Sequence, residues 1–231
     1  ESVGLKAAER AIARLNSRKI KTTKCPVVFS AEMAGGLMRG LFGAMRGSAI
    51  YRDASFLGGK LNEQLFPDWV NIAEQPHLLQ ALGSAPFDNE GVATTDKKLI
   101  DAGHLTTYLL DSYSARKLKM TTTGHAGGVR NPMIQSTGQS REALLKEMGT
   151  GLYITELMGQ GSNTVTGDYS RGAAGFWVEN GEIAYPVEEI TVAGNLQQMF
   201  QDLEAVATDN DIPSSYNTGS WLIKQMTVAG N

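Results

Sequence analysis

The sequence predicts an α+β fold with a mainly antiparallel, curved sheet and flanking helices. Strand and helix patterns do not alternate regularly along the chain, which argues against a doubly wound parallel sheet. Two apolar runs meet at Asn180-Gly181, a dipeptide typical of two-residue β-hairpin turns. The 231 residues include 26 glycines but no internal repeat or low-complexity linker. We therefore expect one domain, over residues 1–231.

The first part of the chain predicts helices and strands from apolar periodicity. Residues 7–15 show the spacing of an amphipathic helix. Residues 25–30, CPVVFS, read as a short buried strand. A glycine-rich helix is expected from about Ala31, and a strand over residues 69–72 between prolines.

The later part of the chain adds turn and cap residues to the same periodic patterns. Gly149 follows a helical stretch directly, as glycine often does at a helix end. The expected elements are a strand at 103–110, helices at 111–119 and 142–149, a strand at 151–159, the hairpin at 176–187, a helix at 195–207 and a strand at 221–228.

Composition narrows the classes of function. A net charge of −3 and a pI near 5.7 provide no electrostatic footprint for nucleic acid. No apolar run approaches the roughly 18 residues of a membrane span. The lone Cys25 excludes an internal disulfide and a cysteine-rich zinc site, and we expect a buried, inert thiol in a cytoplasmic protein. The chain opens in a helical pattern, as if part of a longer protein.

The helix beginning near Ala31 carries glycines at intervals of four, three and four, namely Gly36, Gly40, Gly43 and Gly47. Glycine costs roughly 1 kcal/mol relative to alanine inside a helix, so this stripe needs an explanation. One interpretation is close packing of the helix on the protein's own sheet. The other is a groove wall that faces a peptide or a partner.

Two further segments are candidate binding sites. Gly124 and His125 lie in the glycine-rich stretch TTTGHAGGVRN, which is either a plain turn or a loop whose amides approach a ligand. Asp168, Arg171 and Gly172 lie in TGDYSRGAAG, where a local ion pair is possible. That stretch reads either as a tight turn before the hairpin or as a cleft edge that accepts an extended peptide as an added strand.

Histidine spacing excludes one common zinc motif. No two of the three histidines share the i, i+4 spacing that places zinc ligands on one helix face. We expect His77 at the surface and His104 in a structural position at the start of a strand.

Three segments together resemble one protein family. They are SYSARKL at 112–118, TTGHAGG at 122–128, and MGTGLYITELMGQGSNTVTGDYSRGAAGFWVENGEIAYPVEEITVAGNL at 148–196. They are similar to the C-terminal half of the TldD/PmbA family of bacterial peptidases, in the arm called PmbA or TldE. The resemblance covers essentially the whole chain. It implies that residues 1–231 are a C-terminal domain and that the family's N-terminal domain is absent from them.

The resemblance implies a heterodimeric zinc peptidase that acts on small or unfolded peptides, including a peptide-antibiotic precursor. The TldD arm carries HExxxH on a helix, and a cysteine near its C-terminus is a further zinc ligand. Aligned by eye, Arg39, Gly40 and Ala44 stand where His, Glu and His would be, and Thr218 or a neighbour stands near the cysteine position. These side chains make no zinc site, so we expect no catalytic, metal or cofactor-binding residue in this chain.

The leading hypothesis is a metal-free subunit that pairs with a TldD-like paralogue, the zinc-bearing partner, and helps to enclose peptide substrates. One alternative is a hydrolase active on its own through a metal or nucleophile not visible in the sequence. The other is a peptide-binding module without catalysis. Neither nucleic acid nor a membrane is expected as a partner.

Overall fold

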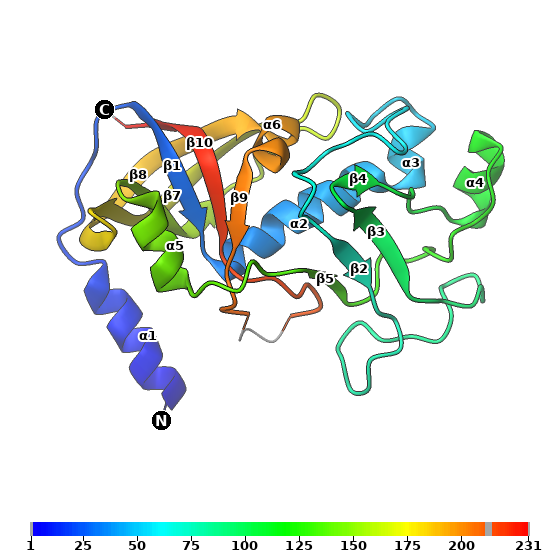
Figure 1. Cartoon of the computed structure of the whole chain (residues 1–231), viewed down its shortest axis with the longest axis horizontal. Helices are drawn as coiled ribbons and strands as arrows, with labels where there is room; N and C mark the ends of the chain where they lie inside the picture. The colour runs from blue at the N-terminus through cyan, green and yellow to red at the C-terminus, as the bar shows by residue number, and fades with distance from the viewer. Residues whose placement is uncertain (1, 211–213, 231) are drawn as a thin grey trace.

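A computed structural model describes residues 2–210 and 214–230. A strand barrel lies at one end of the molecule and a smaller sheet at the other, with a long helix between them (Figure 1). The predicted α+β class is confirmed. The expected single curved antiparallel sheet is corrected, because one sheet closes on itself and the other is separate.

The larger sheet forms a five-stranded barrel with a sixth strand attached. Its strands are β1 (Thr23–Phe29), β6 (Gly151–Met158), β7 (Asp168–Glu179), β8 (Glu182–Asn195) and β10 (Trp221–Ala229), with β9 (Leu203–Val206) beside β10. The ring closes where β1 pairs antiparallel with β10, with Val28 opposite Leu222. On its other side β1 runs parallel to β6, with Val28 opposite Tyr153. The barrel is therefore mixed, and closure leaves few free strand edges.

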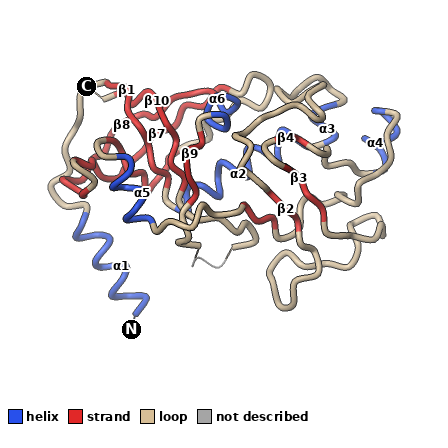
Figure 2. Tube along the Cα trace, in the orientation of Figure 1, coloured by secondary structure: helices blue, strands red, loops and turns tan. Residues whose placement is uncertain are grey.

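The smaller sheet is antiparallel in the order β4-β3-β2-β5. Its strands are β2 (Ile72–Glu74), β3 (Lys97–Asp101), β4 (His104–Leu105) and β5 (Pro132–Ile134). The strand expected at 69–72 begins only at Ile72, because Val70 N donates to Pro67 O in a turn. The strand expected at 103–110 ends at Leu105, and Leu109 N instead donates to Met45 O of the central helix. Long loops surround these short strands (Figure 2).

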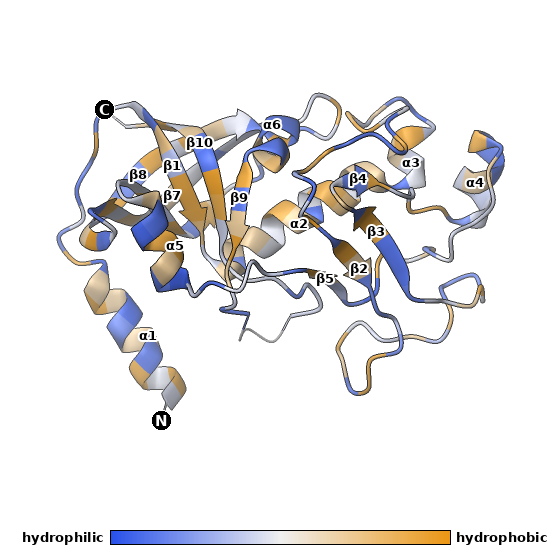
Figure 3. Cartoon of the chain, in the orientation of Figure 1, coloured by the Kyte–Doolittle hydropathy of each residue, from blue (hydrophilic) through white to orange (hydrophobic). Residues whose placement is uncertain are grey.

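Helix α2 (Ala31–Met45) lies between the two sheets and carries much of the core. All of its buried residues except Ala31 join one cluster with side chains from both sheets, among them Phe29 of the barrel and Ile72 of the smaller sheet. The other helices are α1 (Ser2–Ala13), α3 (Gly47–Ile50), α4 (Ser112–Leu118), α5 (Arg141–Met148) and α6 (Leu196–Gln201). Hydrophobic residues concentrate where α2 and the strands meet (Figure 3).

Local signals place several elements correctly. Ser140 caps α5 by accepting from Ala143 N, and Gly149 ends it with φ +69°. Asn180 and Gly181 both have positive φ, at +54° and +79°, as a type I′ hairpin turn requires. The predictions for α5 and for the hairpin are confirmed.

The helix expected at 195–207 is too long. Asn195 caps α6 by accepting from Gln197 N, but the helix ends at Gln201. Residues Leu203–Val206 instead form β9, with Val206 opposite Trp221 of β10. Pairing with a distant strand overrides the local helical pattern here.

The expected burial of Cys25 in β1 is confirmed, and desolvation raises the pKa of its thiol to about 11, which disfavours the reactive thiolate. Within residues 2–210 and 214–230, none of the helices has the length and apolar character needed to span a bilayer.

Candidate functional site

Helix α2 carries the three positions at which the resemblance places the two histidine ligands and the glutamate of HExxxH in the sister arm. It is α-helical throughout Ala31–Met45, so positions five residues apart lie roughly 140° apart around its axis. Accordingly Arg39 is exposed, whereas Ala44 is fully buried and its carbonyl accepts from Ser55 Oγ at 2.6 Å. Gly40, between them, is half-buried. The three positions therefore do not converge on one point.

The Arg39 guanidinium rests on an aromatic pair. Its Cζ lies 5.5 Å from the centroid of the Tyr216 ring, and Tyr216 stacks on Phe42 with centroids 5.8 Å apart. Such a cation–π contact contributes about 0.5–1 kcal/mol at an exposed site. A cation held here repels a metal cation. Sequence reasoning missed Tyr216, which lies far from α2 along the chain and has no local signal.

The residues present do not fit the zinc ion that the family resemblance implies. Among the residues that the structure describes, no group of three or more His, Cys, Asp or Glu side chains could hold a metal ion. Thr218, near the expected cysteine position, is buried. Its Oγ1 accepts from Trp221 Nε1 at 2.6 Å and donates to Gly219 O at 3.0 Å, so the hydroxyl is fully engaged.

The glycine stripe on α2 is not a tight contact with the sheet. A Cβ at Gly36 would meet nothing within 4 Å, and Cβ atoms at Gly40 and Gly43 would make ordinary contacts at 3.7 and 3.9 Å. Only at Gly47, in α3, would a Cβ overlap neighbouring side chains, those of Ser114 and Leu110. Packing on the protein's own sheet is therefore the wrong interpretation for the α2 glycines. The groove-wall interpretation stays a prediction.

A cavity of about 490 Å³ lies between the smaller sheet and the end of the barrel. Its lining combines apolar side chains with amides and hydroxyls; they come from Asn71, Ala73, Met133, Ile134, Gln135, Ser136, Ala207, Thr208, Asn210, Thr218 and Gly219. Along the chain, Thr218 is two residues from Tyr216, which contacts Arg39 on α2. No residue of α2 lines the cavity itself. We refer to the cavity as the groove.

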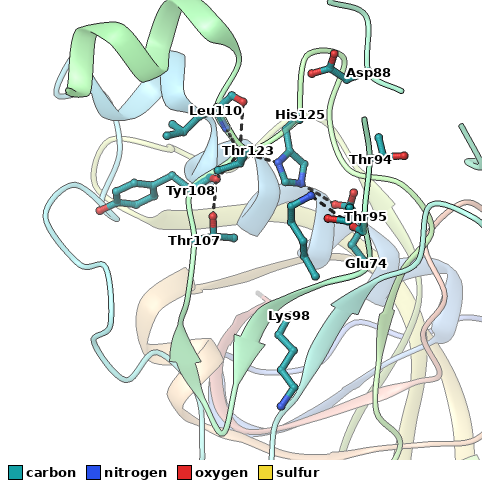
Figure 4. Close-up of polar contacts among 12 residues, drawn as sticks. Glu74, Asp88, Thr94, Thr95, Lys98, Thr107, Tyr108, Leu110, Thr123 and His125 are labelled. Carbon is teal, nitrogen blue, oxygen red and sulfur yellow. Dashed lines mark hydrogen bonds and ion pairs between the residues drawn. The ribbon is translucent and has the colours of Figure 1, made fainter. Parts of the chain in front are cut away.

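His125 is not at a ligand-facing surface. Its Nε2 lies 2.7 Å from Glu74 Oε2 and its Nδ1 lies 2.8 Å from Thr123 Oγ1, with both side chains of the Glu74–His125 pair completely buried (Figure 4). Glu74 Oε1 is buried and has no hydrogen-bond partner among the described residues. Gly124 precedes the histidine with φ +71°, in a turn. Sequence reasoning missed Glu74, which lies on β2, because the two residues are 51 positions apart.

The predicted positions of the other two histidines are confirmed, and the structural role of His104 stays a prediction. His77 is exposed and its Nε2 lies 3.1 Å from Thr94 Oγ1. His104 is exposed at the start of β4, with Nδ1 2.8 Å from Ala102 O.

Asp168, Arg171 and Gly172 lie in β7 and not in a turn. β7 pairs with β8 from Asp168 to Glu179 and with β6 from Gly172 to Val178. The loop before β7 covers its remaining edge, since Ser170 N donates to Gly161 O. A peptide therefore has no free edge of β7 to join, which overturns both the turn and the strand-addition interpretations of this stretch.

The expected ion pair within this stretch is wrong as well. Asp168 Oδ2 accepts from Thr166 Oγ1 at 2.6 Å. Arg171 Nη2 reaches Leu157 O at 3.4 Å, and its buried Nε has no hydrogen-bond partner in the described part of the chain. The two side chains therefore make separate contacts at the rim of the barrel and do not pair with each other.

Tyr169 lies between Asp168 and Arg171 in the sequence, and the titration of its buried phenol tests the burial of this part of the barrel rim. Desolvation raises the pKa of its phenol to about 12, and the Arg171 guanidinium opposes that rise. The buried hydroxyl has no hydrogen-bond partner among residues 2–210 and 214–230. Because the folded pKa exceeds the ordinary value of about 10, the neutral phenol stabilises the fold below about pH 10 and loses this effect as pH rises through about 12.

Tyr169→Phe is therefore expected to change the free energy of unfolding by less than about 1 kcal/mol at pH 7, because no hydrogen bond is lost. Above pH 10 the variant should be more stable than the parent, and urea unfolding at pH 7 and pH 11 measures both. Tyr113→Phe, at an exposed position, is the matched control. It should leave the free energy of unfolding unchanged at both pH 7 and pH 11. A loss above about 2 kcal/mol at pH 7 would show that the hydroxyl has a partner.

Comparison with known proteins gives a consistent result. The family model "PmbA/TldA metallopeptidase C-terminal domain" matches residues 22–230. Metalloprotease PmbA of Escherichia coli O157:H7 is 54% identical over 230 residues, which is 100% of this chain and 51% of that protein. The Metalloprotease PmbA homolog of Haemophilus influenzae is 50% identical over 231 residues, covering 99% of this chain and 51% of that protein. The chain thus spans about half the length of these relatives.

Solved structures agree on the fold. A crystal structure from Bacteroides thetaiotaomicron superposes with a TM-score of 0.94 at 32% identity, over 99% of this chain and 52% of that one. TldE from Thermococcus kodakarensis gives a TM-score of 0.84 at 22% identity, over 98% of this chain and 55% of that one, a likeness of fold alone. With the family model matching nearly its whole length and half of its residues shared with metalloproteases of the PmbA type, the chain belongs to the PmbA/TldD metallopeptidase family.

Proposed function

We propose that this chain is the metal-free arm of a zinc peptidase, which pairs with an HExxxH-bearing TldD-like paralogue and helps to enclose small or unfolded peptides. The observation that carries the proposal is the set of side chains that α2 presents at the metal-site positions of the sister arm. Where the paralogue would present its ligands, this helix exposes an arginine and buries an alanine methyl group, with a glycine between them. Zinc is then supplied by the partner subunit, and a cytoplasmic location suits the reduced, buried Cys25.

The groove supports a role in holding peptide. An extended peptide offers alternating backbone donors and acceptors, and the amides and hydroxyls of the groove can meet them while its apolar floor takes side chains. Gly36 leaves space beside α2 through which a peptide backbone or a partner subunit can approach. Gly124 and His125 are buried, which argues against them as peptide contacts. Asp168, Arg171 and Gly172 are exposed or partly exposed at the barrel rim and keep that assignment as a proposal.

Mixing the two arms tests the proposal. Hydrolysis of a fluorogenic peptide by this chain, by the paralogue and by their mixture should be compared at equal subunit concentrations, with complex formation followed by size-exclusion chromatography. We expect a complex and activity in the mixture, with no activity in this chain alone. Hydrolysis by this chain alone would favour an independent hydrolase. Peptide binding without any complex would favour a binding module, and either result would contradict the proposal.

A further inference from the structure

Helix α1 is exposed along its entire length. None of its twelve residues is buried, and it projects from the body beside α5 (Figure 1). Two ion pairs attach its side to the body, Arg10 to Glu32 at 3.1 Å and Arg14 to Glu156 at 2.8 Å. Both pairs are exposed to solvent, and such pairs contribute about 0–1 kcal/mol each.

The apolar side of α1 points away from the body. At about 100° per residue, Leu5, Ile12 and Leu15 fall on one stripe, roughly 160° from the side that carries Arg10 and Arg14. These three side chains are 64%, 67% and 63% exposed. The helix thus turns its charged side to the body and its apolar side to solvent, the reverse of a surface helix that packs on its own domain.

An isolated helix of this length is marginally stable in water, and two exposed ion pairs add little. Apolar residues seven positions apart on one helix face, as Leu5 and Ile12 are, form the seam along which one helix packs on another. Stable helix formation at α1 therefore calls for a surface that covers Leu5, Ile12 and Leu15.

The comparisons indicate what that surface is. The C-terminal domain model begins at residue 22, so α1 lies outside it. The relatives nevertheless match this chain along its whole length, α1 included, and are about twice as long. We propose that the apolar stripe of α1 docks on the half of the full-length family protein that precedes the C-terminal domain, and so fixes the two halves against each other. This proposal rests on family membership and is independent of the proposed function.

A chimera tests the docking. The half of the Escherichia coli relative that precedes its matched region is fused in register before this chain, and hydrogen exchange at residues 2–15 is compared with the chain alone. We expect these amides to exchange at least about 100-fold more slowly in the chimera. Equal exchange rates in the two proteins would overturn the proposal.

Substitutions on the two sides of the helix identify the docking surface. L5D combined with I12D should abolish the protection in the chimera and leave the melting temperature of the chain alone unchanged. Lys6→Gln, off the stripe, is the matched control and should preserve the protection. If the chain alone instead forms dimers that L5D and I12D dissociate, the occupant is a second copy and the proposal is wrong. Comparison of the variants within the chimera remains decisive even if the chain alone is unstable.

Discussion

Replacing His125 by alanine is expected to lower the free energy of unfolding by about 3–5 kcal/mol. The substitution removes the partner of Glu74 Oε2 and leaves a completely buried carboxyl group with neither oxygen hydrogen-bonded to a described residue. A buried carboxyl group without a hydrogen-bond partner costs more free energy than the lost contact itself. Chemical denaturation monitored by tryptophan fluorescence measures the effect.

The double variant separates this cause from simple loss of packing. His125→Ala together with Glu74→Leu removes both polar partners, so it should recover a large part of the stability lost in His125→Ala. His104→Ala, at an exposed histidine in the same sheet, should change stability by less than about 0.5 kcal/mol. If His125→Ala and His104→Ala lower the free energy of unfolding by similar amounts, the buried pair does not hold the smaller sheet together.

Gly175→Ala is the second substitution with a large expected effect. Gly175 lies opposite Ile154 at an irregularity in the pairing of β6 and β7, and a Cβ there would overlap the backbone carbonyl of Tyr153. Backbone atoms cannot move aside as a flexible side chain can, so the strands must separate. We expect a loss of about 3 kcal/mol or more, or a chain that no longer folds.

Gly172→Ala, three residues earlier in the same strand, is the control for this prediction. Its Cβ would come no closer than 3.4 Å to a flexible Met158 side chain. The change should cost less than about 1 kcal/mol, because 3.4 Å from Met158 Cβ is an ordinary van der Waals contact. Similar losses for Gly172→Ala and Gly175→Ala in thermal unfolding would contradict the strand geometry described above.

The sequence predicted elements whose determinants are local. The turn at Asn180-Gly181 needs only the two residues with positive φ, and α5 needs only its cap and its final glycine. Barrel closure was not predictable, because it depends on β1 pairing with β10 near the other end of the chain. A separate pairing, between β9 and β10, converted the end of an expected helix into a strand. Short-range patterns carry no information about such partners.

The candidate site likewise has features that the sequence predicted locally and features that depend on distant contacts. Chemistry alone showed that Arg39, Gly40 and Ala44 provide no metal ligand. The contacts that define the site, Arg39 on Tyr216 and His125 on Glu74, join distant segments that only the fold brings together. Glycine-rich stretches were the least reliable signal, since TGDYSRGAAG proved to be mostly paired strand.

Metal analysis of the complex and of its separated arms tests the central claim most directly. Inductively coupled plasma mass spectrometry on this chain, purified without chelator and supplied with zinc, should find far less than one equivalent per chain. The paralogue under the same conditions should retain about one zinc, as a single HExxxH site provides. A full equivalent of zinc bound to this chain alone would contradict the assignment of a metal-free arm.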